Sequence, residues 1–182
     1  METVAFTAMA DGTKEEYEFL RGLEHEVSVA DHVLELFETV RGSSGGYQIT
    51  RYEHALQTAT RAHRAGESEQ YVVAALLHDI GECIAPDRHG EVAGAILEPF
   101  VSDELVWIVR HHGLFQMYYY AHHFGEDRNV RDRYRDHPYF GACVKFCEVY
   151  DQCSFDPDYD TEPVEFFVPM VRRVMSRAEP AP

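Results

Sequence analysis

A histidine–aspartate pair inside an apolar segment is the part of this 182-residue sequence best suited to carry chemistry. His78 and Asp79 stand in the run VVAALLHDIGE, so a packed helix would hold an adjacent nitrogen and carboxylate donor rigidly. Further donors of the same types flank the pair in the order His54, His89, His111–His112 and Asp151. Imidazole and carboxylate ligands together suit iron, manganese or zinc better than calcium. The set therefore predicts a transition-metal site.

The number of donors indicates two metal ions. Asp79 is the natural bridge, because its two carboxylate oxygens can join the ions while His78 binds one of them. The other donors then divide between the ions: His54 and Asp151 complete the first, and His89 with one histidine of the pair at 111–112 holds the second. Neighbours on a helix point about 100° apart, so only one of that pair can be a ligand. The second ion keeps open positions, which is typical of catalytic sites.

The composition limits the classes of partner. Thirty-two acidic residues against sixteen basic ones give a formal charge of −16, which disfavours nucleic acid. No export signal and no membrane-spanning run occur, so a cytoplasmic protein with a small-molecule partner is expected. An arginine cluster that includes Arg128 and Arg131 can serve a small anion. The four cysteines form no CxxC pair and are expected to be reduced thiols of the core.

The hydrophobic pattern is helical nearly throughout and predicts an all-α bundle. Thr50 and Glu53 match a capping box at the start of the helix that carries His54. The expected helices cover residues 14–25, 29–41, 51–65, 69–80, 90–98, 103–119, 138–151 and 164–177. A glycine/serine loop is expected at 42–46, and a structured loop with helical turns at 121–137. We expect one domain over 1–182, with N-terminal helices and this loop in 1–46 and a catalytic core in 47–173.

The ordered ligand set resembles the HD-domain superfamily. The segment YEHALQTATRAHRAGESEQYVVAALLHDIGE is similar to its branch of diiron oxygenases, which includes myo-inositol oxygenase and organophosphonate-cleaving enzymes. RYEHALQ, HHGLFQMYYYAHHFGEDRNVRDRYRDHP and EVYDQCSFDPDYD resemble the phosphonate-cleaving members, and WIVRHHGLF resembles the fourth-histidine helix of the inositol enzyme. The resemblance implies an HD-domain helical bundle with a dinuclear site in its core. It also selects His112 as the ligand and leaves His111 to contact the substrate.

The same resemblance implies a function. Two iron ions in the Fe(II)/Fe(III) state and dioxygen would cleave the C–P bond of an organophosphonate. The expected substrate is of the 1-hydroxy-2-(trimethylammonio)ethylphosphonate type, and the products are glycine betaine and phosphate. A monomer or small homo-oligomer is expected, without nucleic-acid or membrane partners. The alternative is an HD phosphohydrolase, a phosphatase or nucleotidase in which a metal-activated water attacks phosphorus.

Departures from the enzymes that take a primary amine refine the expected substrate. Glu82 stands where those enzymes have a histidine, Gln116 where a lysine meets the phosphonate, and Tyr47 where an acidic residue grips the ammonium. Tyrosine suits a quaternary ammonium, which lacks N–H donors but is attracted to aromatic rings. Arg128 and Arg131 would replace the lysine as phosphonate ligands. Asp79 and Glu82 are the expected catalytic residues. Glu82 would hydrogen-bond a water or another ligand at the open metal ion, orient the substrate hydroxyl, or attract the cationic end of the substrate.

Overall fold

The computed structural model describes residues 3–24, 28–42 and 45–176, and this part of the chain contains helices and no strand. The α-helices are α1 (Lys14–Glu24), α2 (Val29–Glu38), α3 (Arg51–Arg64), α4 (Glu69–Leu77), α5 (His89–Leu97), α6 (Asp103–Tyr120), α7 (Phe140–Lys145) and α8 (Val164–Val174). Short 3-10 helices cover Met9–Asp11, Thr39–Gly42, Pro86–Arg88, Ala121–Phe124 and Val130–Tyr134, and a π-helical turn covers Phe146–Asp151. The all-α prediction is confirmed.

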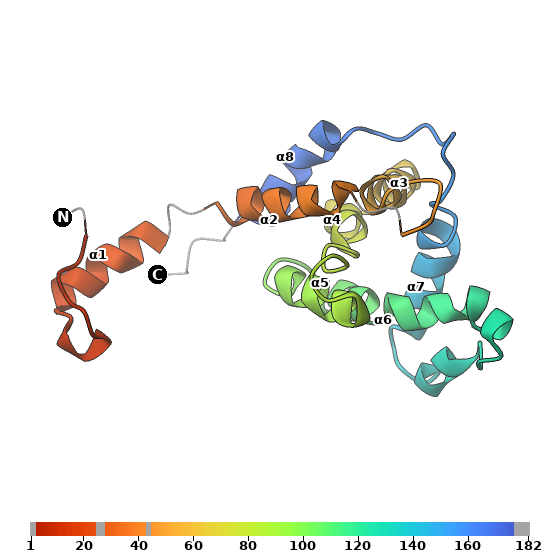
Figure 1. Ribbon diagram of the computed structural model, residues 1–182, viewed down its shortest axis with the longest axis horizontal. Coiled ribbons are helices and arrows are strands. Elements are labelled where there is room, and N and C mark those ends of the chain that lie inside the picture. The colour runs from red at the N-terminus through yellow and green to blue at the C-terminus, as the bar shows by residue number, and fades with distance from the viewer. Residues whose placement is uncertain (1–2, 25–27, 43–44, 177–182) are drawn as a thin grey trace.

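Helix α4 is the centre of the bundle. Its residues from Val72 to Leu77 are each at most 1% exposed, so the helix is apolar on every side. Such a helix must be covered all round, and α3, α6 and α8 pack against it. Figure 1 shows α5 and α6 on one side of α4, α2 and α8 on the other, and α1 set apart from the bundle. None of the helices in the described part of the chain has the length and apolarity needed to cross a membrane.

Two of the predicted helix boundaries are wrong in ways that matter for the metal ligands. Helix α4 was expected to extend to residue 80, but it ends at Leu77, with His78 as its C-cap. Tight turns replace it, since the amide of Ile80 donates to Leu77 and that of Glu82 donates to Asp79. The helix expected at 138–151 starts at Phe140 and widens into the π-helical turn that ends on Asp151.

The remaining predicted features are mostly confirmed. The capping box at the start of α3 is present, and the stretch 121–137 holds only short helical turns. Of the expected core thiols, Cys143 and Cys147 are buried, but Cys83 is exposed. In the expected loop at 42–46, residues 43–44 lie outside the described part of the chain, as do residues 25 and 177 at the ends of two expected helices.

Two glycines allow the elements that carry ligands to approach closely. A Cβ at Gly90 would lie 2.8 Å from the carbonyl oxygen of Val109, so α5 and α6 touch backbone to backbone there. A Cβ at Gly81 would lie 2.7 Å from the carbonyl oxygen of His89. Real side-chain atoms do not tolerate such distances. The two glycines therefore bring the turn after α4, the start of α5 and the middle of α6 together.

Candidate metal centre

The predicted ligands converge from five segments of the chain. His54 lies in the first turn of α3, His78 and Asp79 follow α4, His89 opens α5, His112 lies within α6, and Asp151 closes the π-helical turn. All are buried except His89, which is half-buried. Buried polar groups need partners, and these residues find theirs in one another.

Asp79 stands between two pairs of histidines. Its Oδ2 lies 3.7 Å from His54 Nε2 and 3.6 Å from His78 Nε2. Its Oδ1 lies 3.4 Å from His89 Nε2 and 3.1 Å from His112 Nε2. One carboxylate oxygen therefore faces each pair, which is the arrangement that a bridging ligand requires.

Asp151 joins the first pair. Its Oδ1 lies 3.2 Å from His54 Nε2 and 3.7 Å from His78 Nε2. Its Oδ2 is buried without a hydrogen-bond partner among the described residues. A buried carboxylate oxygen without a partner is costly. A cation between His54, His78 and Asp151 would remove that cost.

Backbone contacts fix which ring nitrogen of each histidine faces the cluster. The Nδ1 atoms lie close to carbonyl oxygens that can only accept: His54 to Ser154 at 2.8 Å, His78 to Ala75 at 2.8 Å, His89 to Pro86 at 2.6 Å and His112 to Val109 at 2.6 Å. Each Nδ1 therefore carries a proton, and each ring, when neutral, presents the lone pair of Nε2. Metal-binding histidines are typically oriented in this way.

The spacing of these lone pairs fits metal ions. The Nε2 atoms of His54 and His78 are 3.2 Å apart, and so are those of His89 and His112. When both rings are neutral, no proton joins these two nitrogens, whereas donors about 2.1 Å from a shared ion lie roughly 3.0 to 3.4 Å apart. The cluster thus provides three histidine or aspartate donors around one position and two histidines around the other, with Asp79 between them.

The electrostatics of the cluster also favour cations. Burial opposes the charge of the His54, His78 and His112 rings, but the neighbouring carboxylates outweigh burial and raise the pKa of each ring. Burial likewise opposes the ionisation of Asp79 and Asp151, yet contacts with the histidines lower the pKa of both carboxyl groups. Positive charge is therefore stabilised within the cluster.

A cavity of about 520 Å³ opens beside the cluster and is lined by candidate ligands of both groups, namely His54, Asp79, His89, His112 and Asp151. Three of the predicted substrate contacts line it, namely Tyr47, Glu82 and Gln116. Tyr119 and Tyr120 also line the cavity, and sequence reasoning missed several other lining residues: Arg51, Asp87, Gln152 and Phe155. Arg51 had a usable signal, because it precedes His54 by three residues and so shares its helix face.

The three predicted contacts that line the cavity have defined surroundings. Glu82 Oε1 lies 3.2 Å from Arg51 Nη2, and Glu82 Oε2 lies 3.2 Å from His89 Nδ1. The Tyr47 ring stacks on Phe155, with ring centroids 4.7 Å apart, and Phe155 stacks on His54 at 4.3 Å. The cation nearest the Tyr47 ring is Arg51, whose guanidinium carbon is 5.0 Å from the ring centroid. Glu82 is therefore not a solvated helix-end residue.

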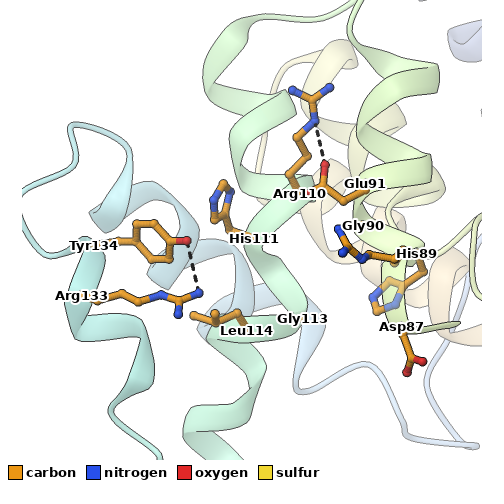
Figure 2. Close-up of a pocket in the computed structure, with 11 residues that line it drawn as sticks. Asp87, His89, Gly90, Glu91, Arg110, His111, Gly113, Leu114, Arg133 and Tyr134 are labelled. Carbon is orange, nitrogen blue, oxygen red and sulfur yellow. Dashed lines mark hydrogen bonds and ion pairs between the residues drawn. The ribbon is translucent and has the colours of Figure 1, made fainter. Parts of the chain in front are cut away.

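Arg128, Arg131 and His111 are not among the described residues that line this cavity. Arg128 and Arg131 lie over the ring of Tyr118, at 4.1 and 3.7 Å from its centroid. His111 lines a second pocket of about 350 Å³, shown in Figure 2 with Arg133 and Tyr134. The ring of His111 stacks on Trp107 at 4.1 Å, and the candidate ligand His89 also lines this second pocket. Packing on aromatic rings thus explains why these three predicted contacts lie elsewhere.

Comparison with known proteins agrees with this geometry. The sequence model of the HD domain matches residues 51–145, which is more than half of the chain. The chain belongs to the HD-domain family. The match begins at the first residue of α3 and includes every candidate ligand except Asp151.

One curated relative of this HD-domain protein is an oxygenase. Over 78 residues the chain is 40% identical to 1-hydroxy-2-(trimethylamino)ethylphosphonate dioxygenase (glycine-betaine-forming) of Leisingera caerulea. The alignment covers 37% of this chain and 40% of the relative, so the chain spans less than half of the length of the curated relative it matches. The similarity points to an enzyme of the HD-domain oxygenase type.

Proposed function

We propose that this protein is a dioxygen-dependent diiron oxygenase that cleaves the C–P bond of a 1-hydroxy-2-(trimethylammonio)ethylphosphonate-type substrate. The observation that carries the proposal is the division of five donors about Asp79 into two groups, with one oxygen of the Asp79 carboxylate facing each group. The 40% identity to a phosphonate dioxygenase supports the choice of reaction. Residues 47–173 would form the catalytic core, and residues 1–46 would lie outside it.

The proposed ligands divide as the distances suggest. His54, His78 and Asp151 would hold one iron ion, His89 and His112 the other, and Asp79 both. When bound as an Fe(II)/Fe(III) pair, the ions would supply the redox chemistry that lets dioxygen oxidise the substrate carbon. The ion held by His89 and His112 has fewer protein ligands and therefore more open positions, so we assign the substrate to that ion.

The overall reaction balances without a further reductant. The C1–H and C1–P bonds break, one oxygen atom of dioxygen enters the carboxylate of glycine betaine, and the other enters phosphate. The C1 carbon is oxidised and dioxygen is reduced. No nicotinamide or flavin is needed.

The residues of this chain would position the substrate. Glu82 and Gln116 line the cavity beside the proposed ligands, and the amide of Gln116 can donate a hydrogen bond to the phosphonate. Tyr119 and Tyr120 provide aromatic rings for the trimethylammonium group, which is attracted to their faces. The pKa of Tyr119 is raised to about 12, chiefly by burial, so its phenol stays neutral and can donate a hydrogen bond.

Oxygen uptake tests the proposal. Protein with its iron content measured should consume dioxygen and release phosphate in equal amounts when given the trimethylammonium substrate, and should turn over the primary-amine analogue more slowly. The same mixture without dioxygen should release nothing. Phosphate release from phosphate esters under anaerobic conditions would instead identify a phosphohydrolase and refute the proposal.

A further inference from the structure

An ion pair between Arg51 and Glu82 lines the cavity next to the proposed metal ligands. The guanidinium Nη2 of Arg51 lies 3.2 Å from Glu82 Oε1, and its Nη1 lies 3.7 Å from Asp79 Oδ2. The two side chains are only 19% and 21% exposed. Arg51 opens α3 beside the capping box, and Glu82 lies in the tight turn after α4. Hydrogen-bonded backbone therefore carries both residues.

Arg51 is the one arginine in the cavity lining, and no lysine is found there among the described residues. Its guanidinium presents a planar set of donors that matches the oxygens of a phosphonate. The arginines expected for this task, Arg128 and Arg131, pack on Tyr118 instead. An anionic group that reaches the cavity therefore has a single side-chain cation to meet.

Glu82 offers the opposite charge beside it. Its carboxylate makes contacts to Arg51 and to the His89 ring, which orient its oxygens toward the cavity. A trimethylammonium group has no N–H to donate, so it is bound by electrostatic attraction and by apolar contact. Tyr47 is less suited to that task, because its ring stacks on Phe155 and already has Arg51 as its neighbouring cation.

We propose that Arg51 and Glu82 together recognise a zwitterion: Arg51 binds the phosphonate, and Glu82 attracts the trimethylammonium group. This inference rests on the proposed function for the choice of substrate. Only two carbon atoms separate phosphorus from nitrogen in the substrate, so its opposite charges lie close together. The charges of Arg51 and Glu82 are also close together. On binding, the Arg51–Glu82 ion pair would be replaced by two ion pairs, one between Arg51 and the phosphonate and one between Glu82 and the trimethylammonium group. Neither side chain would then lack a partner of opposite charge. A ligand that carries the phosphonate but no cationic group would place two negative charges, the phosphonate and the Glu82 carboxylate, close together.

Ligand binding without turnover tests this inference. The ligands are 2-(trimethylammonio)ethylphosphonate, which lacks the C1 hydroxyl, and 3,3-dimethylbutylphosphonate, its uncharged-head isostere with carbon in place of nitrogen. Affinities would be measured by calorimetry under anaerobic conditions, with the metal content of each protein sample matched. The wild-type protein should prefer the zwitterion to the isostere. Failure of the wild-type protein to bind the zwitterion, or to prefer it, would overturn the proposal.

The variants separate the two roles. Arg51→Ala should weaken both ligands by roughly 10- to 100-fold, the usual effect of losing a hydrogen bond between charged groups. Glu82→Gln should abolish the preference and tighten the isostere, because a negative charge next to its phosphonate is removed. Arg51→Lys keeps the charge but loses the planar donor set, so it should weaken both ligands less than alanine does. It also provides a folded variant if Arg51→Ala does not fold.

Control variants that remove the same charges elsewhere are available, one in α3 and one in α5. Arg64→Ala removes an arginine from the far end of α3 that pairs with Asp160 and Glu162, and Glu91→Gln neutralises a glutamate that pairs with Arg110. Both controls should bind as the wild type does. Retention of the zwitterion preference in Glu82→Gln would refute the inference. If the wild-type protein prefers the zwitterion but consumes no dioxygen with the hydroxylated substrate, C–P cleavage is refuted while recognition by Arg51 and Glu82 is retained.

Discussion

Replacing Asp79 with alanine should release both metal ions, because one oxygen of its carboxylate faces each histidine pair. By the observed distances the first ion would have four protein donors, His54, His78, Asp151 and Asp79, and the second ion three. The substitution leaves three donors for the first ion and two for the second. We expect the second ion to be lost first, because it loses one of three donors whereas the first ion loses one of four.

The size of the effect follows from the number of donors. A structural zinc site with four ligands contributes about 10 to 16 kcal/mol, and we take this range as the scale for the first ion. If the donors contribute equally, each contributes about 2.5 to 4 kcal/mol, which is roughly 10²- to 10³-fold in affinity. The mutual repulsion of histidine lone pairs 3.2 Å apart adds to that loss, because the bridging negative charge no longer offsets it.

Metal analysis after dialysis against a graded series of chelator concentrations measures both affinities. Asp151→Ala is the matched control, since its oxygen Oδ1 contacts only the first pair of histidines. It should lose one ion and retain the other, whereas Asp79→Ala should lose both. Circular dichroism would confirm that both variants stay helical. Two ions per chain at wild-type affinity in Asp79→Ala would refute the assignment of Asp79 as the bridge.

Two further predictions concern pH and packing. The raised pKa values of His54, His78 and His112 mean that, as the pH falls, protons displace metal from Nε2 already above the ordinary value of 6.5, which metal analysis at graded pH would show. In metal-free protein the charged rings stabilise the fold fully below pH 6.5, the ordinary pKa of histidine, and this contribution is lost as the pH rises through the raised pKa. Melting temperatures measured with and without metal should therefore depend differently on pH. Gly90→Ala should destabilise the fold by about 1 to 3 kcal/mol in urea denaturation, because its Cβ meets a backbone oxygen. Gly141→Ala in α7, where the space is open, should instead be neutral or stabilise by up to about 1 kcal/mol.

The sequence predicts the features of this fold that depend on neighbouring residues. The capping box of Thr50 and Glu53 is a local signal, and it places the start of α3 and hence His54 correctly. Apolar periodicity likewise places most of the helices within a few residues. The six donors could be chosen because their order along the chain matches a known pattern, and the structure brings all six together.

Features that depend on contacts between distant segments were missed. The end of α4 at Leu77 follows from the close approach of Gly81 to the start of α5, which no periodicity shows. Arg128 and Arg131 look available for an anion in the sequence, but the ring of Tyr118 holds both. Arg51 is not predicted as a cavity residue, because the neighbouring residues Thr50 and Glu53 indicate only the start of a helix.

The charge of the cavity differs from that of the whole molecule. The chain has a formal charge of −16, which repels a phosphonate at long range, but salt screens such repulsion beyond about 8 Å. Inside the cavity the lining has four carboxylates, Asp79, Glu82, Asp87 and Asp151, against the guanidinium of Arg51. That lining alone is negative, and an Fe(II)/Fe(III) pair would make it positive. Binding of the anionic substrate group would therefore be coupled to metal binding, and Arg51 would direct the phosphonate once the metal ions have reversed the sign.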